Sequence, residues 1–257
     1  MTLAEQYIAF MTIVRKEIRR YLRIWTQTLL PSAITMSLYF VIFGSLIGSR
    51  IGDMGGFTYM QFVVPGLIMM AIVTNSYSNV VSSFFGSKFN NSVEELLVSP
   101  TPNYVILMGY VVGGITRGLF VAVVVTLVSL FFTRLHVHSY VIVAVTVLMT
   151  STLFALAGFI NAVYANSFDD ISIIPTFVLT PLIYLGGVFY SMDLLPDFWA
   201  GVSRLNPLVY VVNAFRYGVL GVSDVSLPLA FGMIGLFTVA AFSFSMHLLN
   251  SGTRLRQ

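Results

Sequence analysis

The sequence has no cysteine among its 257 residues, and only 9% of the residues are charged. The lack of cysteine excludes disulfides and thiolate metal sites. The scarcity of charge, beside 57% hydrophobic residues, excludes a soluble domain and leaves a polytopic α-helical membrane protein as the class that fits. No basic patch interleaved with aromatic residues is present, so we expect no nucleic-acid partner.

Motifs of enzyme chemistry are missing as well. The sequence has no G-x-S-x-G, no H-E-x-x-H and no Walker A loop, because the segment Gly86-Ser87-Lys88 lacks the required glycine spacing. His136 and His138 have no carboxylate or cysteine near them in sequence, which makes a poor metal site. We therefore expect no catalytic, cofactor-binding or metal site in this chain and no means of hydrolysing ATP by itself. No removable signal peptide is expected, because the first 23 residues lack a compact apolar core before a small-residue cleavage site.

What the sequence does contain is a series of long apolar runs. They predict a single all-α membrane domain over 1–257, with an amphipathic interfacial helix over 1–23 and a bundle of six transmembrane helices over 24–257. The six spans are expected near 29–47, 57–85, 104–132, 140–164, 171–189 and 227–249.

The first 23 residues show helical periodicity. One stripe carries the apolar residues Leu3, Tyr7, Phe10, Val14, Ile18 and Tyr21. The charged residues lie mostly off that stripe; they are Arg15, Lys16, Glu17, Arg19, Arg20 and Arg23. Such a helix lies along an anionic membrane surface or is a solvated helix packed on protein. In both cases we expect the basic residues to remain in the cytoplasm.

The distribution of basic residues predicts the orientation. With an inside N-terminus and six spans, the inner side receives Arg15, Lys16, Arg19, Arg20, Arg23, Lys88, Arg254 and Arg256. The outer side receives Arg50, Arg134, Arg204 and Arg216, and Arg117 falls within a span. This bias follows the positive-inside rule and predicts that both termini are cytoplasmic.

The stretch 186–218, between the last two spans, is too interrupted to cross a bilayer. Pro196 and Pro207 divide it into two pieces, each with proline at the expected first helical position. A helix of about ten residues reaches only ~15 Å, about half of the ~30 Å hydrocarbon core. We expect a re-entrant hairpin of two short helices that dips into the outer face, its polar ends covered by other parts of the protein.

The predicted inner loop, 86–104, contains a short helix signal. Asn90, Asn91 or Ser92 is expected to cap it, and Glu94 and Glu95 fall in its first turn, where the helix dipole favours negative charge. An apolar knob of Leu96, Leu97 and Val98 follows, and then Pro100 and Pro102 end the helix. The residues alone leave two uses open, a docking site for a partner protein and an ordinary connector.

The second predicted span carries a polar stripe at helical spacing, made by Asn75, Asn79, Ser82 and Ser83. It should face protein or water, and serves interhelical packing or lines a substrate path. Arg117, in the third span, is expected to extend towards the cytoplasm or to pair with one of the nearby acids Glu94, Glu95, Asp169 and Asp170.

Several segments resemble the ABC-2 type permeases, the membrane subunits of bacterial ABC exporters. They are Glu94-Glu95-Leu96-Leu97-Val98-Ser99-Pro100, Leu195-Pro196, Asn206-Pro207-Leu208-Val209-Tyr210 and Arg216. The resemblance extends over essentially the whole chain. It departs from the usual pattern at Gly186-Gly187 and Tyr190-Ser191, both at the start of the hairpin.

The resemblance implies a bacterial inner-membrane homodimer with two separate ATP-binding subunits on the cytoplasmic side, which hold the ATP and its magnesium. It implies that these subunits dock on the amphipathic start, with Arg15, Lys16, Arg19 and Arg20, and on a coupling loop with Glu94, Glu95, Leu96, Leu97, Ser99 and Pro100. It further implies that the two short outer helices close the outer end of the path, through Pro196, Trp199, Asn206, Pro207, Tyr210 and Arg216.

The leading functional hypothesis is therefore the permease subunit of an ATP-driven exporter. The alternative is an ion- or proton-coupled secondary transporter that acts without an ATPase. That alternative needs ionisable groups near mid-membrane, and the spans offer almost none apart from Arg117. An integral membrane enzyme is a third hypothesis and lacks a paired nucleophile and base. The family exports polysaccharides, lipid-linked molecules and drugs, and no motif selects among them.

Overall fold

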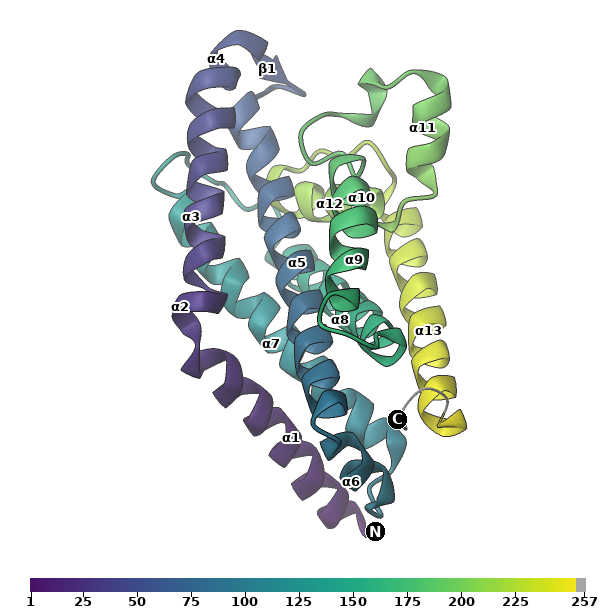
Figure 1. Cartoon of the computed structure of the whole chain (residues 1–257). Helices are drawn as coiled ribbons and strands as arrows, with labels where there is room; N and C mark the ends of the chain where they lie inside the picture. Colours follow the sequence, from purple (N-terminus) through teal and green to yellow (C-terminus); the bar gives the residue numbers. More distant parts are fainter. Residues whose placement is uncertain (253–257) are drawn as a thin grey trace.

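The computed structural model describes residues 1–252, without the side chains of Ser45 and Ser49. The protein is 80% helical, and its long helices run side by side with the start of α1 and the end of α13 at the same, lower end in Figure 1. Arg254 and Arg256, which the topology prediction places inside, lie outside the described residues.

The N-terminal part is a bent helical arm. Helix α1 (Leu3–Arg23) begins with a capping box between Thr2 and Glu5, and it ends at Ile24. After this bend come α2 (Trp25–Thr28), α3 (Leu30–Tyr39), a π-helical stretch η1 (Phe40–Ile47) and α4 (Gly48–Ile51). Two-residue strands β1 (Asp53–Met54) and β2 (Phe57–Thr58) then pair antiparallel, with Asp53 opposite Thr58.

Helix α5 (Tyr59–Phe89) is the central helix and is buried along most of its length. It packs between α7 (Asn103–Ser129) and α8 (Tyr140–Tyr164), and the short helix α6 (Ser92–Val98) follows it at the lower end (Figure 1). Glycines allow the close approach: a Cβ at Gly114 would lie 2.9 Å from the Ala155 Cβ, and one at Gly158 would lie 2.5 Å from the Tyr77 carbonyl oxygen. The core is therefore built around α5. Small residues at the contacts allow this close packing, as they do in other membrane helix bundles.

The last third begins with a composite helix made of α9 (Asp170–Ile174), the π-helical η2 (Pro175–Leu179) and α10 (Thr180–Tyr184). After a turn come the 3-10 helix η3 (Met192–Leu194), α11 (Asp197–Arg204) and α12 (Pro207–Leu220). Helix α13 (Leu227–Ser251) then descends along the outside of the bundle (Figure 1).

Among the described residues, five helices are long and apolar enough to cross a membrane. They are Trp25–Gly44, Tyr59–Phe89, Asn103–Ser129, Tyr140–Tyr164 and Leu227–Ser251, close to five of the six predicted spans. The remaining predicted span, 171–189, is helical only to Tyr184. The helix Asp170–Tyr184 has 15 residues and so rises about 22 Å, which is short of the ~30 Å core. A sixth crossing stays a prediction.

The stretch 186–218 forms two short helices, α11 and α12, at the places that its prolines predict. Pro207 is the first residue of α12, as expected, whereas Pro196 is the N-cap of α11 and precedes its first turn by one position. Helix α12 is longer than expected, with 14 residues. The two helices also differ in environment, because α12 is almost wholly buried while α11 is largely exposed. Whether they form a re-entrant hairpin in the membrane stays a prediction.

Candidate functional site: a buried polar network between α1, α5 and α7

The polar stripe of α5 lies inside the protein and faces α1 and α7. Asn79 is fully buried, Asn75 and Ser83 are each 5% exposed, and Ser82 is half-buried. Their spacing of three and four residues places them on one side of the helix. The donors and acceptors of this stripe meet charged side chains that come from other helices.

Glu17 of α1 is the centre of the network and is fully buried. Its Oε1 accepts a hydrogen bond from Ser83 Oγ at 2.5 Å, and its Oε2 accepts from Asn79 Nδ2 at 3.4 Å and from Arg20 Nη2 at 3.3 Å. Gly113 of α7 makes room for it, since a Cβ there would lie 2.6 Å from the Glu17 Cβ. The sequence pattern had placed Glu17 off the buried stripe, and this was wrong. A buried carboxylate is tolerated here because three donors surround it, one of which is the cation Arg20.

Arg20 continues the network towards α5. Its Nη2 donates to Asn79 Oδ1 at 2.9 Å and to the Asn79 carbonyl at 2.8 Å, while its Nη1 donates to Ser82 Oγ at 3.2 Å. Ile13, Val14 and Tyr21 of α1 are also buried, so the C-terminal half of α1 packs on protein.

The rest of α1 presents an exposed surface. Leu3 is 84% exposed and Tyr7 is 64% exposed, although both belong to the predicted apolar stripe. Arg15 and Arg19 are exposed, and so is Lys16, whose Nζ lies 3.5 Å from Ser87 Oγ. The second half of α1 thus packs one face on the bundle and leaves the basic side chains Arg15, Lys16 and Arg19 uncovered, while the first half leaves Leu3 and Tyr7 uncovered. Contact of α1 with a membrane surface stays a prediction.

Arg117 of α7 forms a second branch. Its Nη2 donates to Asn75 Oδ1 at 3.0 Å, and Asn75 Nδ2 in turn donates to Ser32 Oγ of α3 at 3.0 Å. The predicted pairing with Glu94, Glu95, Asp169 or Asp170 is wrong. The position of Arg117 explains this, since it stands 14 residues into α7, or about 21 Å from the inner end, where those acids lie.

Taken together, the described side chains Asn75, Asn79 and Ser82 serve as contacts between helices. They connect α1, α3 and α7 to the central helix α5 through charge-assisted hydrogen bonds, which are stronger than neutral ones in a low-dielectric interior. A displacement of α1 therefore acts directly on α5.

The predicted coupling loop is the short helix α6. Glu94 and Glu95 are exposed in its first turn, as expected. Its N-cap is Asn91 in a left-handed conformation, but no side chain caps the helix, because Ser92 Oγ donates to the Ser87 carbonyl instead and stabilises the preceding turn. One of the three predicted residues, Asn91, is therefore the N-cap, and it makes no side-chain hydrogen bond to the helix.

The apolar knob of α6 is smaller than predicted. Leu96 and Leu97 pack against the core, and Val98 alone of the three projects, at 84% exposure. Ser99 ends the helix by donating from its Oγ to the Leu96 carbonyl at 2.6 Å, and Pro100 is exposed beyond it. Figure 1 shows α6 at the same end as the start of α1. The exposed acids of α6 thus lie at the same end as the start of α1, whereas the exposed Arg15 and Arg19 lie about 18–24 Å further along α1.

The outer segment is held by side chains that cover the end of α10. Asn206 Nδ2 donates to the Leu182 carbonyl at 2.7 Å, and Asn206 Oδ1 accepts from the Leu208 amide at 3.0 Å, which caps α12 at Pro207. Tyr210 Oη donates to the Arg204 carbonyl at 2.6 Å and ties α12 back to α11. These hydrogen bonds satisfy backbone groups that the ends of the short helices leave without a partner inside the helix.

Arg216 is the most buried of the predicted outer residues, with no exposed surface. Its Nη2 donates to the Gly187 carbonyl at 2.6 Å, and its guanidinium lies 3.8 Å from the ring centroid of Phe62 on α5. Its Nε and Nη1 have no hydrogen-bond partner in the part of the chain that the structure describes. Trp199, by contrast, is 47% exposed on α11, and Pro196 before it is exposed as well. Arg216 therefore belongs to the interior and Trp199 to the surface.

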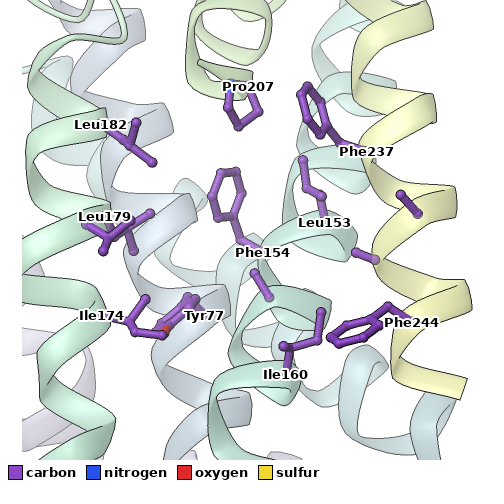
Figure 2. A pocket seen from close by; sticks show the side chains of 14 residues that line it. Tyr77, Leu153, Phe154, Ile160, Ile174, Leu179, Leu182, Pro207, Phe237 and Phe244 are labelled. Atoms are coloured by element: carbon purple, nitrogen blue, oxygen red, sulfur yellow. The ribbon is translucent and has the colours of Figure 1, made fainter. Parts of the chain in front are cut away.

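A cavity of about 420 Å³ lies between α8, the composite helix α9–η2–α10 and α13. Figure 2 shows Leu179 and Leu182 on one side of it, Phe237 and Phe244 on the other, and Phe154 between them. The full lining is Tyr77, Leu153, Phe154, Ala157, Ile160, Ile174, Val178, Leu179, Leu182, Pro207, Phe237, Ala240, Ala241 and Phe244. No sequence pattern indicates this cavity, because its walls come from α5, α8, the composite helix, α12 and α13, which are far apart in the chain.

Comparison with known proteins gives the family. The model of the family described as "ABC-2 type transporter" matches residues 8–220. The chain belongs to the ABC-2 type transporter family. This match contains most of α1, all of α6 and both outer helices, so the segments that suggested the resemblance lie within it. The family is one of transport permeases and not of enzymes.

Relatives cover nearly the whole permease. It is 59% identical to "Inner membrane transport permease YadH" of Escherichia coli (strain K12) over 250 residues, which is 97% of this chain and 98% of the relative. It is 22% identical to "Nodulation protein J" of Neorhizobium galegae over 243 residues, 93% of this chain and 92% of that protein. It is also 22% identical to "Nodulation protein J" of Rhizobium leguminosarum bv. viciae over 213 residues, 82% of each chain.

Proposed function

We propose that the permease is the membrane subunit of an ATP-driven exporter in the bacterial inner membrane. It works as a homodimer with two separate ATP-binding subunits, which hold the ATP and magnesium on the cytoplasmic side. The chain crosses the membrane six times, the helix Asp170–Tyr184 and the turn after it making the fifth crossing, and α11 with α12 forms a re-entrant hairpin on the outer side. The membership of the ABC-2 family and the name of the Escherichia coli relative support this proposal.

The observation that carries it is the exposed helix α6 at the same end of the protein as the start of α1 (Figure 1). Glu94, Glu95 and Val98 project from α6, and Arg15 and Arg19 project from the second half of α1. Exposed acids on one helix and exposed basic residues on another suit a protein partner that carries complementary charge. The same end holds the last residues of α13, which agrees with an even number of crossings and cytoplasmic termini (Figure 1).

The buried network supplies a route for coupling. ATP binding by the partner subunits shifts α1 and α6, and the hydrogen bonds of Glu17 and Arg20 pass that shift to α5. Helix α5 also contacts the turn after α10, because the Tyr59 hydroxyl donates to the Phe189 carbonyl at 3.1 Å. The dimer thus changes between states through contacts that differ in each state.

Reconstitution with the ATPase tests the proposal. In vesicles that contain the permease and its ATP-binding subunit, the double variant Glu94→Lys/Glu95→Lys should hydrolyse ATP while substrate transport falls at least tenfold. Asp53→Lys is the matched control, since Asp53 is an exposed acid at the opposite end, and it should transport normally. Wild-type coupling in the double variant would contradict the docking role of α6.

The direction of transport is tested with a panel of glycans, lipid-linked molecules and drugs. An exporter should give ATP-dependent uptake of its substrate into inside-out vesicles and none into right-side-out vesicles.

Reporter fusions test the topology. A reporter after Lys88 should report the cytoplasm and one after Ser203 the outer side. If both reporters gave the same side, the crossing by Asp170–Tyr184 would be absent. An odd number of crossings would then remain, and the C-terminus would lie outside.

The secondary-transporter alternative gains one observation from the structure. Glu17 is a buried ionisable group, and it lies in α1, outside the predicted spans, which offer almost no ionisable group apart from Arg117. Vesicles that contain only the permease decide between the two functions. Uptake driven by a proton or ion gradient without the ATP-binding subunit would favour the alternative, and uptake that needs both ATP and that subunit would exclude it.

A further inference from the structure

We propose that the apolar cavity between α8, α9–η2–α10 and α13 is a binding site for one acyl chain of a membrane phospholipid. This inference does not depend on the export function, because it concerns what the folded chain holds in the bilayer. It goes beyond the family match, which assigns no ligand to these residues.

The chemistry of the lining decides the class of ligand. Apart from the Tyr77 hydroxyl, every side chain on the wall is a hydrocarbon, and the cavity has about 420 Å³. That size is within the range of ligand pockets, ~300–1,000 Å³. A water molecule needs two to four polar partners to be held, and this wall does not supply them, so the cavity is not a water site. The side chains around an empty cavity lack dispersion contacts on that side. A hydrocarbon supplies those contacts, so it is the class of ligand that fits this lining.

The depth of the cavity selects the part of the lipid. The lining residues of α13, Phe237 to Phe244, lie within five residues of the middle of Leu227–Ser251, or about 8 Å along the helix. Those of α8, Leu153 to Ile160, lie within eight residues of the middle of Tyr140–Tyr164, or about 12 Å. Both distances are less than half of the ~30 Å hydrocarbon core, so the cavity meets acyl chains and not headgroups.

The cavity also opens sideways. Ile174 is 38% exposed, Val178 is 48% exposed and Phe244 is 42% exposed, all at the rim, whereas Tyr77 and Leu179 at the inner wall are buried. Pro207 at the start of α12 closes one end, as Figure 2 shows. A chain therefore enters from the bilayer between the composite helix and α13, and its end reaches the side chains of α5 and α8.

Photolabelling in vesicles tests the inference. The probe is phosphatidylcholine with a diazirine near the end of one acyl chain. With labelling resolved residue by residue, we expect the lining residues of α8 and α13 to be labelled at least fivefold above Leu236 and Val239 on the outer face of α13, which is open to bulk lipid. These lining residues are Leu153, Phe154, Ala157, Ile160, Phe237, Ala240, Ala241 and Phe244. The double variant Ala157→Phe/Ala241→Phe fills the cavity and should abolish this excess. Ala144→Phe, on the same helix α8 but in a separate apolar hollow against α7, should leave it unchanged.

The outcomes are distinct. Labelling of the lining no higher than that of Leu236 and Val239, or an excess that survives in the filled variant, overturns the inference. A second copy of the chain over the cavity would also overturn the inference. Because the sequence has no cysteine, the single variant Ala241→Cys can be treated with a short bismaleimide. Cross-linking of two chains would show that protein covers the cavity. If the filled variant fails to fold, the wild type still decides, because a diazirine at the headgroup should label the lining at least fivefold less than one at the chain end.

Discussion

Replacement of Glu17 by alanine is the most direct test of the buried network. In the structure this side chain accepts hydrogen bonds from Ser83, Asn79 and Arg20 and has no exposed surface. The substitution removes all three acceptor contacts and leaves the side chain of Ser83 and the amide of Asn79 without this acceptor in the interior.

The magnitude follows from those contacts. A buried donor that loses its partner costs about 1–3 kcal/mol. Two such donors, Ser83 Oγ and Asn79 Nδ2, give a loss of roughly 2–6 kcal/mol. Arg20 adds little, since it keeps its bonds to the Asn79 carbonyl and to Ser82. We expect the lower half of that range, about 2–4 kcal/mol, because polar groups in membrane proteins also find partners in the unfolded state. At about 2–4 °C per kcal/mol for a chain of this size, the melting temperature should fall by roughly 4–16 °C.

Trp25 is a suitable reporter because it directly follows the bend at the end of α1. The sequence has two tryptophans, so Trp199→Phe makes Trp25 the only one, and thermal melting is followed by its fluorescence in detergent. Arg15→Ala is the control on the same helix, since Arg15 is exposed and should change stability by less than about 0.5 kcal/mol. Equal melting temperatures for Glu17→Ala and Arg15→Ala would refute the network. Glu17→Gln keeps the volume and one acceptor and should fall between the two.

Two further substitutions test the packing and the outer segment. Gly158→Leu should prevent α5 and α8 from packing together, because a Cβ at this position would already lie 2.5 Å from the Tyr77 carbonyl oxygen. Size-exclusion chromatography should show loss of the folded peak. The control Gly232→Ala, at a position with open space around it, should elute like the wild type. Asn206→Ala removes both the cap of α12 and the partner of the Leu182 carbonyl, at a cost of about 1–3 kcal/mol. Proteolysis between α10 and α12 should then be faster than in the wild type. The control is Phe198→Ala, at a residue that is 71% exposed. Equal proteolysis rates for Asn206→Ala and Phe198→Ala would contradict the capping role.

The local parts of the fold were predictable from the sequence. Long apolar runs set the positions of the five long helices, and the prolines set the breaks at Leu195-Pro196 and Asn206-Pro207, since proline has no amide to donate within a helix. The short inner helix also lies where Glu94 and Glu95 predict it. These features depend on neighbours within a few residues, which the sequence shows directly.

The polar contacts of the site were not predictable, because their partners are distant in sequence. Glu17 meets Ser83 across 66 residues, and Arg117 meets Asn75 across 42. A periodicity pattern counts a glutamate as a surface residue, and nothing near Glu17 in sequence indicates the donors on α5. The fifth span was predicted too long for a similar reason: the π-helical stretch after Pro175 and the turn at Gly187, with φ of 74°, shorten the helix. The cavity was missed because no single helix contains it.

The two groups of buried polar contacts share helix α5, and this has a consequence for coupling. At its lower part, Asn79 and Ser83 bind α1, and at its upper part Tyr59 binds the turn after α10. Gly66 packs so closely on that turn that a Cβ there would lie 2.7 Å from the Val188 carbonyl oxygen. With both ends fixed to one helix, a shift of α1 reaches the outer segment by movement of α5 as a unit, and a physical element that both sites bias is what coupling between distant sites requires. Weakening the contacts of α5 with α1, or those with the turn after α10, should therefore stop a shift of α1 from reaching the outer segment. Helix α1 and the outer segment should each keep their own fold.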